Sequence, residues 1–263
     1  MANQTKPARV ETAAKILLFD LESSPNIGFT WGKFEQNVIE FIKERQIICF
    51  SWEWLDTGEH GTLALPDFPG YKKDPENNKA LIAALHRLFS KADIIIGHNL
   101  DRFDDRRANT DFIKHGFPPP PPHKTVDTLK VVRKYFDFNG NRLSDLGAFL
   151  KVGSKVRHEG FPLWRKCLQG CLRAWAKMRR YNRGDVRLLK RIYLKLRPWI
   201  KTHPAIKVRE DSNKNPPCPQ CDERRLQGRG TSMTRKGRIP RVQCGACGFW
   251  PPIAWIKKAW RVK

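Results

Sequence analysis

Two buried strands constrain the fold of this 263-residue chain more than any other feature. The first lies in KILLFDLE, residues 15–22, and the second in ADIIIG, residues 92–97. Continuous apolar runs of this length are typical of strands covered on both faces of a sheet. Amphipathic helices are predicted over residues 77–90 and 103–115. This alternation predicts an α/β protein with a mixed central sheet.

Other elements follow from the same patterns. Residues 46–55, rich in β-branched and aromatic side chains, are predicted to form a strand, and residues 60–65 another after a tight turn. A further short strand can precede the later helices. Ser144 is the expected N-cap of one later helix, and Pro198 ends the longest. These helices are predicted at residues 126–136, 144–150 and 171–196.

Two acids, Asp20 and Glu22, end the first buried strand. Side chains alternate along a strand, so both carboxylates point to one face, with Leu21 opposite. Adjacent carboxylates resist burial unless a positive group holds them, and a divalent metal ion is the usual one. The alternative is a strand that has reached solvent and ends in two exposed acids.

The charge balance indicates the class of partner. Lysine and arginine number 50 against 26 aspartates and glutamates, a formal net charge of +24. This predicts a polyanionic partner, DNA or RNA, with an acidic membrane surface less favoured. Without a long apolar run, neither a transmembrane helix nor a signal peptide is expected. Four of the seven cysteines form paired CxxC motifs, which favours reduced thiols. We therefore expect a cytoplasmic protein that binds no membrane.

Further acids follow in two places. The segment GHNLDRFDDRRAN, after the second buried strand, carries Asp101, Asp104 and Asp105. Capping of the next helix is an alternative role for all three. On the longest helix Tyr181 and Asp185 are four residues apart and share a face. An intrahelical ion pair and ordinary core packing are the alternatives there.

Taken in order, the motifs DLE, GHNLDRFD and YNRGD resemble those of the 3′→5′ exonucleases named for four acids, Asp-Glu-Asp-Asp (DEDD). The resemblance is to the tyrosine subclass, because the histidine of the other subclass would fall at Arg180. It spans residues 15 to about 200, and the layout is also similar to stand-alone bacteriophage exonucleases. It implies a three-layer ribonuclease H-like fold.

The resemblance also implies roles for five residues. Asp20 would bridge two divalent ions, Mg²⁺ or Mn²⁺. Glu22 and Asp185 would complete the site of the first ion, and Asp104 would hold the second. Tyr181 would orient the attacking water. Hard cations of this kind prefer carboxylate oxygens, and two of them can activate a water and stabilise the leaving oxygen.

The second motif leaves a choice open. Asp101 and Asp105 compete with Asp104 for the metal site, and the family's asparagine-to-aspartate spacing from Asn99 favours Asp104. Asn99 itself is expected to contact the nucleic acid.

A second candidate metal site lies near the C-terminus, in CPQC and CGAC. Two CxxC pairs complete a tetrahedral Zn²⁺ site, and four thiolates leave no open position, so one structural zinc ion is expected. Disulfides and a redox function are the alternatives. The expected ligands of this zinc ribbon are Cys218, Cys221, Cys244 and Cys247.

Basic residues crowd the ribbon and are expected to contact phosphates, whereas its tryptophans are expected to pack its small core. The candidate contacts are Arg224, Arg225, Arg235, Lys236 and Arg238.

The domain organisation follows from these segments. We expect an N-terminal arm over residues 1–14, the exonuclease domain over 15–203, a linker over 204–216 and a nucleic-acid-binding zinc ribbon over 217–263.

The function expected from the sequence is a metal-dependent 3′→5′ exonuclease acting on single-stranded DNA. The same chemistry on RNA, a structure-directed nuclease and a non-catalytic nucleic-acid-binding protein are the alternatives. We expect a monomer, with a polymerase or other replication protein as a partner in trans. If a bacteriophage encodes it, the compartment is the host cytoplasm.

Overall fold

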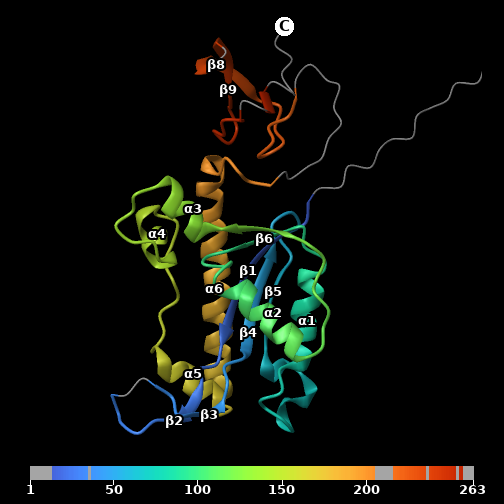
Figure 1. The fold of residues 1–263 in the computed structure, drawn as a ribbon, viewed down its shortest axis with the longest axis vertical. Helices are drawn as coiled ribbons and strands as arrows, with labels where there is room; N and C mark the ends of the chain where they lie inside the picture. Colours follow the sequence, from blue (N-terminus) through green and yellow to red (C-terminus); the bar gives the residue numbers. More distant parts are fainter. Residues whose placement is uncertain (1–13, 35–36, 205–215, 235–236, 253–254, 257–263) are drawn as a thin grey trace, which may run out of the picture. The chain divides into compact units, whose positions relative to one another are not determined.

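The structure is a computed structural model that describes residues 14–34, 37–204, 216–234, 237–252 and 255–256. The chain divides into two compact units, one over Lys15–Lys195 and the other containing Leu196–Lys263 (Figure 1). Within the described residues, no helix is both long and apolar enough to cross a membrane.

A five-stranded sheet forms the centre of the first unit, in the order β5-β4-β1-β6-β7. β4 is antiparallel to both β1 and β5, whereas β6 is parallel to both β1 and β7. The predicted α/β class with a mixed sheet is therefore confirmed. The strands are β1 (Ile16–Ser23), β4 (Ile47–Trp54), β5 (His60–Ala64), β6 (Ile94–Gly97) and β7 (Lys124–Asp127).

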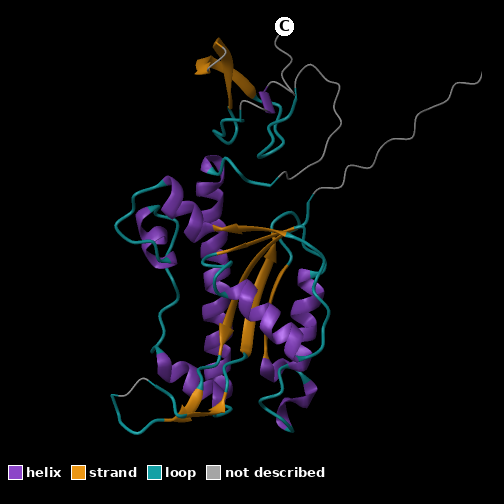
Figure 2. Ribbon diagram, viewed as in Figure 1, coloured by secondary structure: helices purple, strands orange, loops and turns teal. Residues whose placement is uncertain are grey.

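Helices cover both faces of this sheet (Figure 2). α1 and α2 lie on one face and the long helix α6 on the other (Figure 1). The helices are α1 (Lys79–Phe89), α2 (Asp104–Lys114), α3 (Thr128–Tyr135), α4 (Leu143–Phe149), α5 (Phe161–Leu168) and α6 (Leu172–Leu196), with short 3₁₀ helices at Leu65–Asp67, Pro69–Lys72 and Arg197–Trp199.

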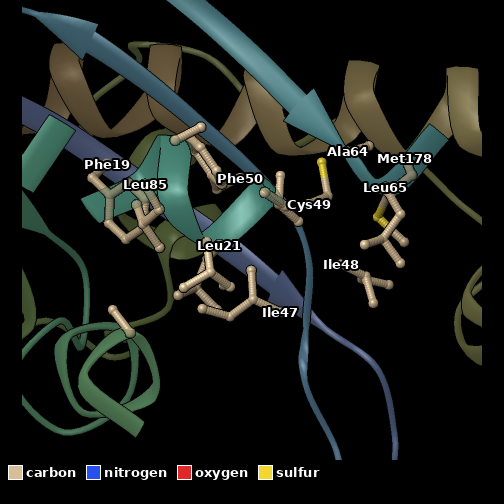
Figure 3. Close-up of a cluster of buried hydrophobic side chains, with 14 of the residues drawn as sticks. Phe19, Leu21, Ile47, Ile48, Cys49, Phe50, Ala64, Leu65, Leu85 and Met178 are labelled. Atoms are coloured by element: carbon tan, nitrogen blue, oxygen red, sulfur yellow. The ribbon is translucent and has the colours of Figure 1, made fainter. Parts of the chain in front are cut away.

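The alternation of β1 separates its core face from its acidic face. Phe19 and Leu21 are buried in the main hydrophobic cluster (Figure 3). The Phe19 ring packs edge-on against Phe89 of α1, with 5.1 Å between centroids. Asp20 and Glu22 consequently point to the opposite face, which α6 covers.

Two predicted boundaries were wrong. The helix predicted from residue 126 begins at Thr128, because Val126 pairs with Ile96 in β7. The Asp127 side chain caps that helix by accepting from the N–H of Leu129. Ser144 is not an N-cap, because α4 already begins at Leu143.

Among the α-helices and strands of the first unit, three were not predicted: α5 and the two strands of a separate hairpin, β2 (Ile27–Phe29) and β3 (Glu40–Lys43). The two strands pair antiparallel with each other and are short and exposed. Their apolar residues lack the regular alternation of a strand with one buried face, which is the signal that sequence analysis relies on.

The second unit is built around an antiparallel hairpin of β8 (Leu226–Thr234) and β9 (Gly237–Cys244). Its small core contains Leu226 and Phe249 with two of the cysteines, and Trp255 packs against it. The expected arm and linker lie almost wholly outside the described residues. The hairpin and the cysteines are compatible with a zinc ribbon.

Candidate active site

Three acids converge from β1 and α6. Asp20 and Glu22 share one face of β1, and Asp185 reaches them from the helix that covers this face. One carboxylate oxygen from each lies within 4.8 Å of the other two. Asp185 is buried, and the two strand acids are half-buried. Asp20 and Glu22 are therefore not the exposed end of a strand, and Asp185 is not part of an intrahelical ion pair.

Asp104 lies next to this cluster at the start of α2. Its side chain is buried, and its Oδ1 accepts a hydrogen bond from the N–H of Leu21 at 3.2 Å. Phe103 occupies the N-cap position of α2, and no side chain caps the helix there. Capping therefore does not explain Asp104.

The two competing acids have other partners. Asp101 accepts a hydrogen bond from Nζ of Lys130 at 2.6 Å. Asp105 lies 3.6 Å from Nε2 of His123. Of the three acids after β6, Asp104 is therefore the one whose carboxylate is buried against β1.

Tyr181 packs beside Asp185 on α6. Its side chain is buried, and its ring centroid lies 4.4 Å from that of His158. Burial, followed by the negative charge of Asp185, raises the pKa of the Tyr181 hydroxyl. The hydroxyl therefore stays protonated and can both donate to and accept from a water molecule.

Two residues that hold the carboxylates, Lys155 and Asn182, were not predicted. Lys155 donates from Nζ to Oδ2 of Asp185 at 2.6 Å and to the Tyr181 hydroxyl at 3.3 Å. Asn182 is fully buried, and its Nδ2 donates to Oδ2 of Asp20 at 2.6 Å. Helical spacing could have found Asn182, which is three residues before Asp185. Lys155 comes from a loop that carries no such signal.

Burial and mutual repulsion disfavour negative charge in this cluster. Burial, and then the charge of Asp185, raise the pKa of Asp20 to about 7. The pKa of Glu22 is raised well above its usual value by burial and by Asp20. Burial also raises the pKa of Asp185, although Lys155 opposes the shift. A cation bound among these groups would remove the repulsion.

The donor set fits a hard divalent ion. All three converging side chains offer carboxylate oxygens, which Mg²⁺ and Mn²⁺ prefer. Among the described residues, Oδ1 of Asp185 is buried without a hydrogen-bond partner, and a metal ion would satisfy it.

The four cysteines gather at one end of the β8–β9 hairpin. Their sulfur atoms lie within 4.8 Å of one another, with 3.8 Å between Cys218 and Cys247 and 3.6 Å between Cys221 and Cys244. These distances exceed the 2.05 Å or so of a covalent S–S bond, so the four cysteines form no disulfide in this structure. The hydrogen bond between the sulfurs of Cys218 and Cys247 lowers the pKa of the Cys247 thiol to about 5 and raises the pKa of the Cys218 thiol. The arrangement fits a closed thiolate site for Zn²⁺.

The predicted nucleic-acid contacts have no common environment. Asn99 is half-buried after β6 with a left-handed φ of 66°, and its N–H donates to Oδ1 of Asp127 at 2.9 Å. Arg224 and Arg225 are exposed. Arg235 and Lys236 lie outside the described residues, and only the backbone of Arg238 is described, in β9. All these contacts stay predictions.

Comparison with known proteins supports the fold and the class of domain. Residues 71–161 match the model of a family described as Exonuclease (RNase_T). The family B DNA polymerase from the hyperthermophilic archaeon Pyrobaculum calidifontis has a similar structure, with a TM-score of 0.52 and 15% identity over 72% of this chain. The chain spans 25% of that polymerase chain. No curated protein sequence matches significantly.

These matches test some of the predictions and leave others untested. The ribonuclease H-like fold class is confirmed, and residues 71–161 match an exonuclease family model. The segment contains Asp104, whereas Asp20, Glu22, Tyr181 and Asp185 lie outside it. Their roles, the tyrosine subclass and the likeness to bacteriophage exonucleases stay predictions.

Proposed function

We propose that this protein is a metal-dependent 3′→5′ exonuclease that hydrolyses the phosphodiester bonds of single-stranded DNA. The observation that carries the proposal is the convergence of Asp20, Glu22 and Asp185 within 4.8 Å, with Asp104 buried beside the same strand. The match of residues 71–161 to an exonuclease family supports it. The net charge of +24 supports a polyanionic substrate.

Asp20, Glu22 and Asp185 would hold one divalent ion, and Asp20 with Asp104 a second. Two such ions, when bound, lower the pKa of a water molecule and stabilise the charge on the leaving oxygen. This donor set explains why acids from β1, α2 and α6 gather at one place in a strongly basic protein.

The other residues of the site position the attacking water and the carboxylates and balance the negative charge. The Tyr181 hydroxyl, kept protonated by burial, hydrogen-bonds and orients the attacking water. Asn182 fixes the rotamer of Asp20 through its 2.6 Å hydrogen bond. Lys155 balances the charge of Asp185 and lies beside Tyr181.

We further propose that Cys218, Cys221, Cys244 and Cys247 hold one structural zinc ion and that the ribbon around it binds nucleic acid. The closed set of four thiols supports the first part, and the exposed Arg224 and Arg225 support the second. Reduced thiols of this kind also support the cytoplasm as the compartment.

The deciding experiment follows single-stranded DNA and RNA of the same sequence, labelled at the 5′ end, in Mg²⁺, Mn²⁺ or EDTA. We expect a ladder that shortens from the 3′ end with either metal ion, faster on DNA. Asp20→Asn should abolish it, because this acid would touch both ions. Asp101→Asn is the matched control, since Asp101 pairs with Lys130 instead.

Three outcomes would contradict the proposal: an Asp20→Asn protein with full activity, shortening that persists in EDTA, or tight binding of both polymers with no cleavage. Faster cleavage of RNA would correct the substrate and leave the chemistry in place.

A further inference from the structure

The β2–β3 hairpin exposes an unusual amount of aromatic surface. At 86% and 87%, Trp31 and Phe34 are the most exposed large hydrophobic side chains among the described residues. Phe29 and Phe41, on the two strands, are 57% and 48% exposed. We refer to these four aromatic residues as the hairpin surface. The pairs Gly28–Phe41 and Phe29–Glu40 place Phe29 and Phe41 on opposite faces of the hairpin. The two rings of the connecting loop, Trp31 and Phe34, therefore offer the largest open area for stacking.

The hairpin continues the strand that carries the candidate metal ligands. β1 ends at Ser23, one residue after Glu22, and β2 begins at Ile27. The seven steps along the chain from Glu22 to Phe29 span at most roughly 25 Å. A nucleic-acid strand rises about 3.4 Å per nucleotide when stacked. A single strand of about seven nucleotides therefore covers the distance from the acids to the hairpin surface.

Two cations lie beside aromatic rings of these regions. The guanidinium of Arg45, two residues after β3, lies 5.9 Å from the ring centroid of Phe103. Phe103 directly precedes Asp104. At the hairpin tip, Nζ of Lys33 lies 5.7 Å from the Phe34 ring centroid. Positive charge is thus available for phosphates at both ends of this path.

A cavity of about 940 Å³ opens at the base of the hairpin. Its lining includes Asn26 from the hairpin base, Tyr71, and Phe161 with Gln169 from α5 and the residue after it. Phe161 is 60% exposed. Ring faces next to side-chain amides are the groups that hold an unpaired base, by stacking and by hydrogen bonds to its edge.

We propose that the hairpin surface and the cavity at its base bind the single-stranded part of the substrate by stacking its unpaired bases. This inference rests on the proposed function, because the strand bound there is the one whose 3′ end reaches Asp20. It makes the substrate a strand with unpaired bases over several nucleotides, and it excludes a fully paired end.

The test measures binding in EDTA, where no cleavage occurs. Fluorescence anisotropy would compare a 15-nucleotide thymidine strand, an abasic strand of equal length and a 15-base-pair duplex. Stacking on a protein ring contributes about 1–3 kcal/mol per base. Trp31→Ala/Phe34→Ala should therefore weaken thymidine-strand binding about tenfold or more. Its affinity for the abasic strand, which keeps the phosphates, should change less than twofold.

Matched variants separate stacking from other effects. Phe149→Ala removes a ring that is 69% exposed outside the hairpin, and it should leave the preference for bases in place. Trp31→Leu/Phe34→Leu keeps apolar surface without rings, and it should lose the preference as the alanine variant does. Circular dichroism melting would confirm that each variant is folded.

Several results would overturn the inference. Equal affinity of the wild type for thymidine and abasic strands would exclude base stacking. Retained base preference in the leucine variant would exclude a role for the rings. A wild-type dimer in sedimentation that the alanine variant converts to monomer would assign the hairpin to a second copy of the chain.

Cleavage is a separate readout. A wild type that binds with base preference in EDTA but cuts neither DNA nor RNA with Mn²⁺ would contradict the proposed function and support the hairpin surface. A wild type that cuts from the 3′ end but binds without base preference would support the proposed function and contradict the role of the hairpin surface.

Discussion

The two candidate metal sites of this protein are built in opposite ways. The carboxylate cluster joins a strand near the start of the chain to a helix more than a hundred residues later, and a five-stranded sheet holds them together. The cysteine cluster comes from two short CxxC motifs at one end of a single hairpin. The first offers hard oxygen ligands and leaves Oδ1 of Asp185 unsatisfied. The second offers four soft thiols and is complete.

The two sites therefore depend on the surrounding fold in different ways. The acids are positioned by a large hydrophobic core and by the hydrogen bonds of Lys155 and Asn182. The cysteines are themselves much of a small core, next to Leu226 and Phe249. A metal ion should therefore be needed for function at the first site and for folding at the second.

The largest effect is expected at the proposed zinc site. Cys221→Ser should unfold the region around β8 and β9, because structural zinc contributes about 10–16 kcal/mol to folding of comparable small domains. Hydrogen exchange should rise across Leu226–Cys244 and stay low across β1. Cys171→Ser, at an exposed cysteine outside the cluster, is the control. Unchanged exchange in both hairpin strands would remove the contrast between the two sites.

The acid cluster should show the opposite behaviour in metal-free protein. Its carboxyl groups have pKa values raised by folding, and that of Asp20 is about 7. The folded state therefore holds protons that the unfolded state releases, so the free energy of unfolding falls as pH rises from about 4 to about 7. The loss is at most roughly 4 kcal/mol for Asp20. Denaturant melts in EDTA at several pH values would measure it.

Two comparisons check the origin of this pH dependence. Asp20→Asn should flatten the pH profile and raise stability at pH 8, while it abolishes cleavage. Addition of Mn²⁺ to the wild type should recover the stability lost at pH 8. If the metal-free stability of the wild type increased from pH 4 to pH 7, burial would not raise the pKa values of these carboxyl groups.

A smaller effect is expected at Tyr181. Tyr181→Phe removes the hydroxyl and keeps the ring that packs against His158. One hydrogen bond to the attacking water is worth about 1–3 kcal/mol, so kcat should fall about tenfold to a hundredfold with little change in KM. Steady-state kinetics on a 5′-labelled strand would measure this. A kcat within twofold of the wild type would exclude the water-orienting role.

The smallest effect concerns Lys155, which forms an ion pair with Asp185 at 2.6 Å. Lys155→Met should lower metal-free stability by about 1–2 kcal/mol, because Asp185 loses its cation. Mn²⁺ should then raise the melting temperature more in this variant than in the wild type. Lys130→Met, which breaks the exposed pair with Asp101, is the control. Equal metal-induced shifts in all three proteins would show that Lys155 does not substitute for the metal ion.

Part of the fold and of the candidate site was predictable because it depends on local periodicity. Alternation along β1 placed Asp20 and Glu22 on one face, and helical spacing placed Tyr181 and Asp185 together. The CxxC spacing identified the four clustered cysteines because it too is a local pattern. Predicted element boundaries were wrong where a local helix signal competed with strand pairing. Val126, for example, joins β7 because it pairs with Ile96 of β6.

The sequence by itself determined the α/β class, the acids on β1 and the cysteine motifs, since each is carried by residues a few positions apart. The tertiary structure decided which acid after β6 lies against β1, that Lys155 and Asn182 hold the carboxylates, and that an aromatic hairpin extends from the strand bearing the site. Those facts depend on contacts between residues far apart in the chain. Such contacts are formed by packing against the common core, and no local pattern specifies them.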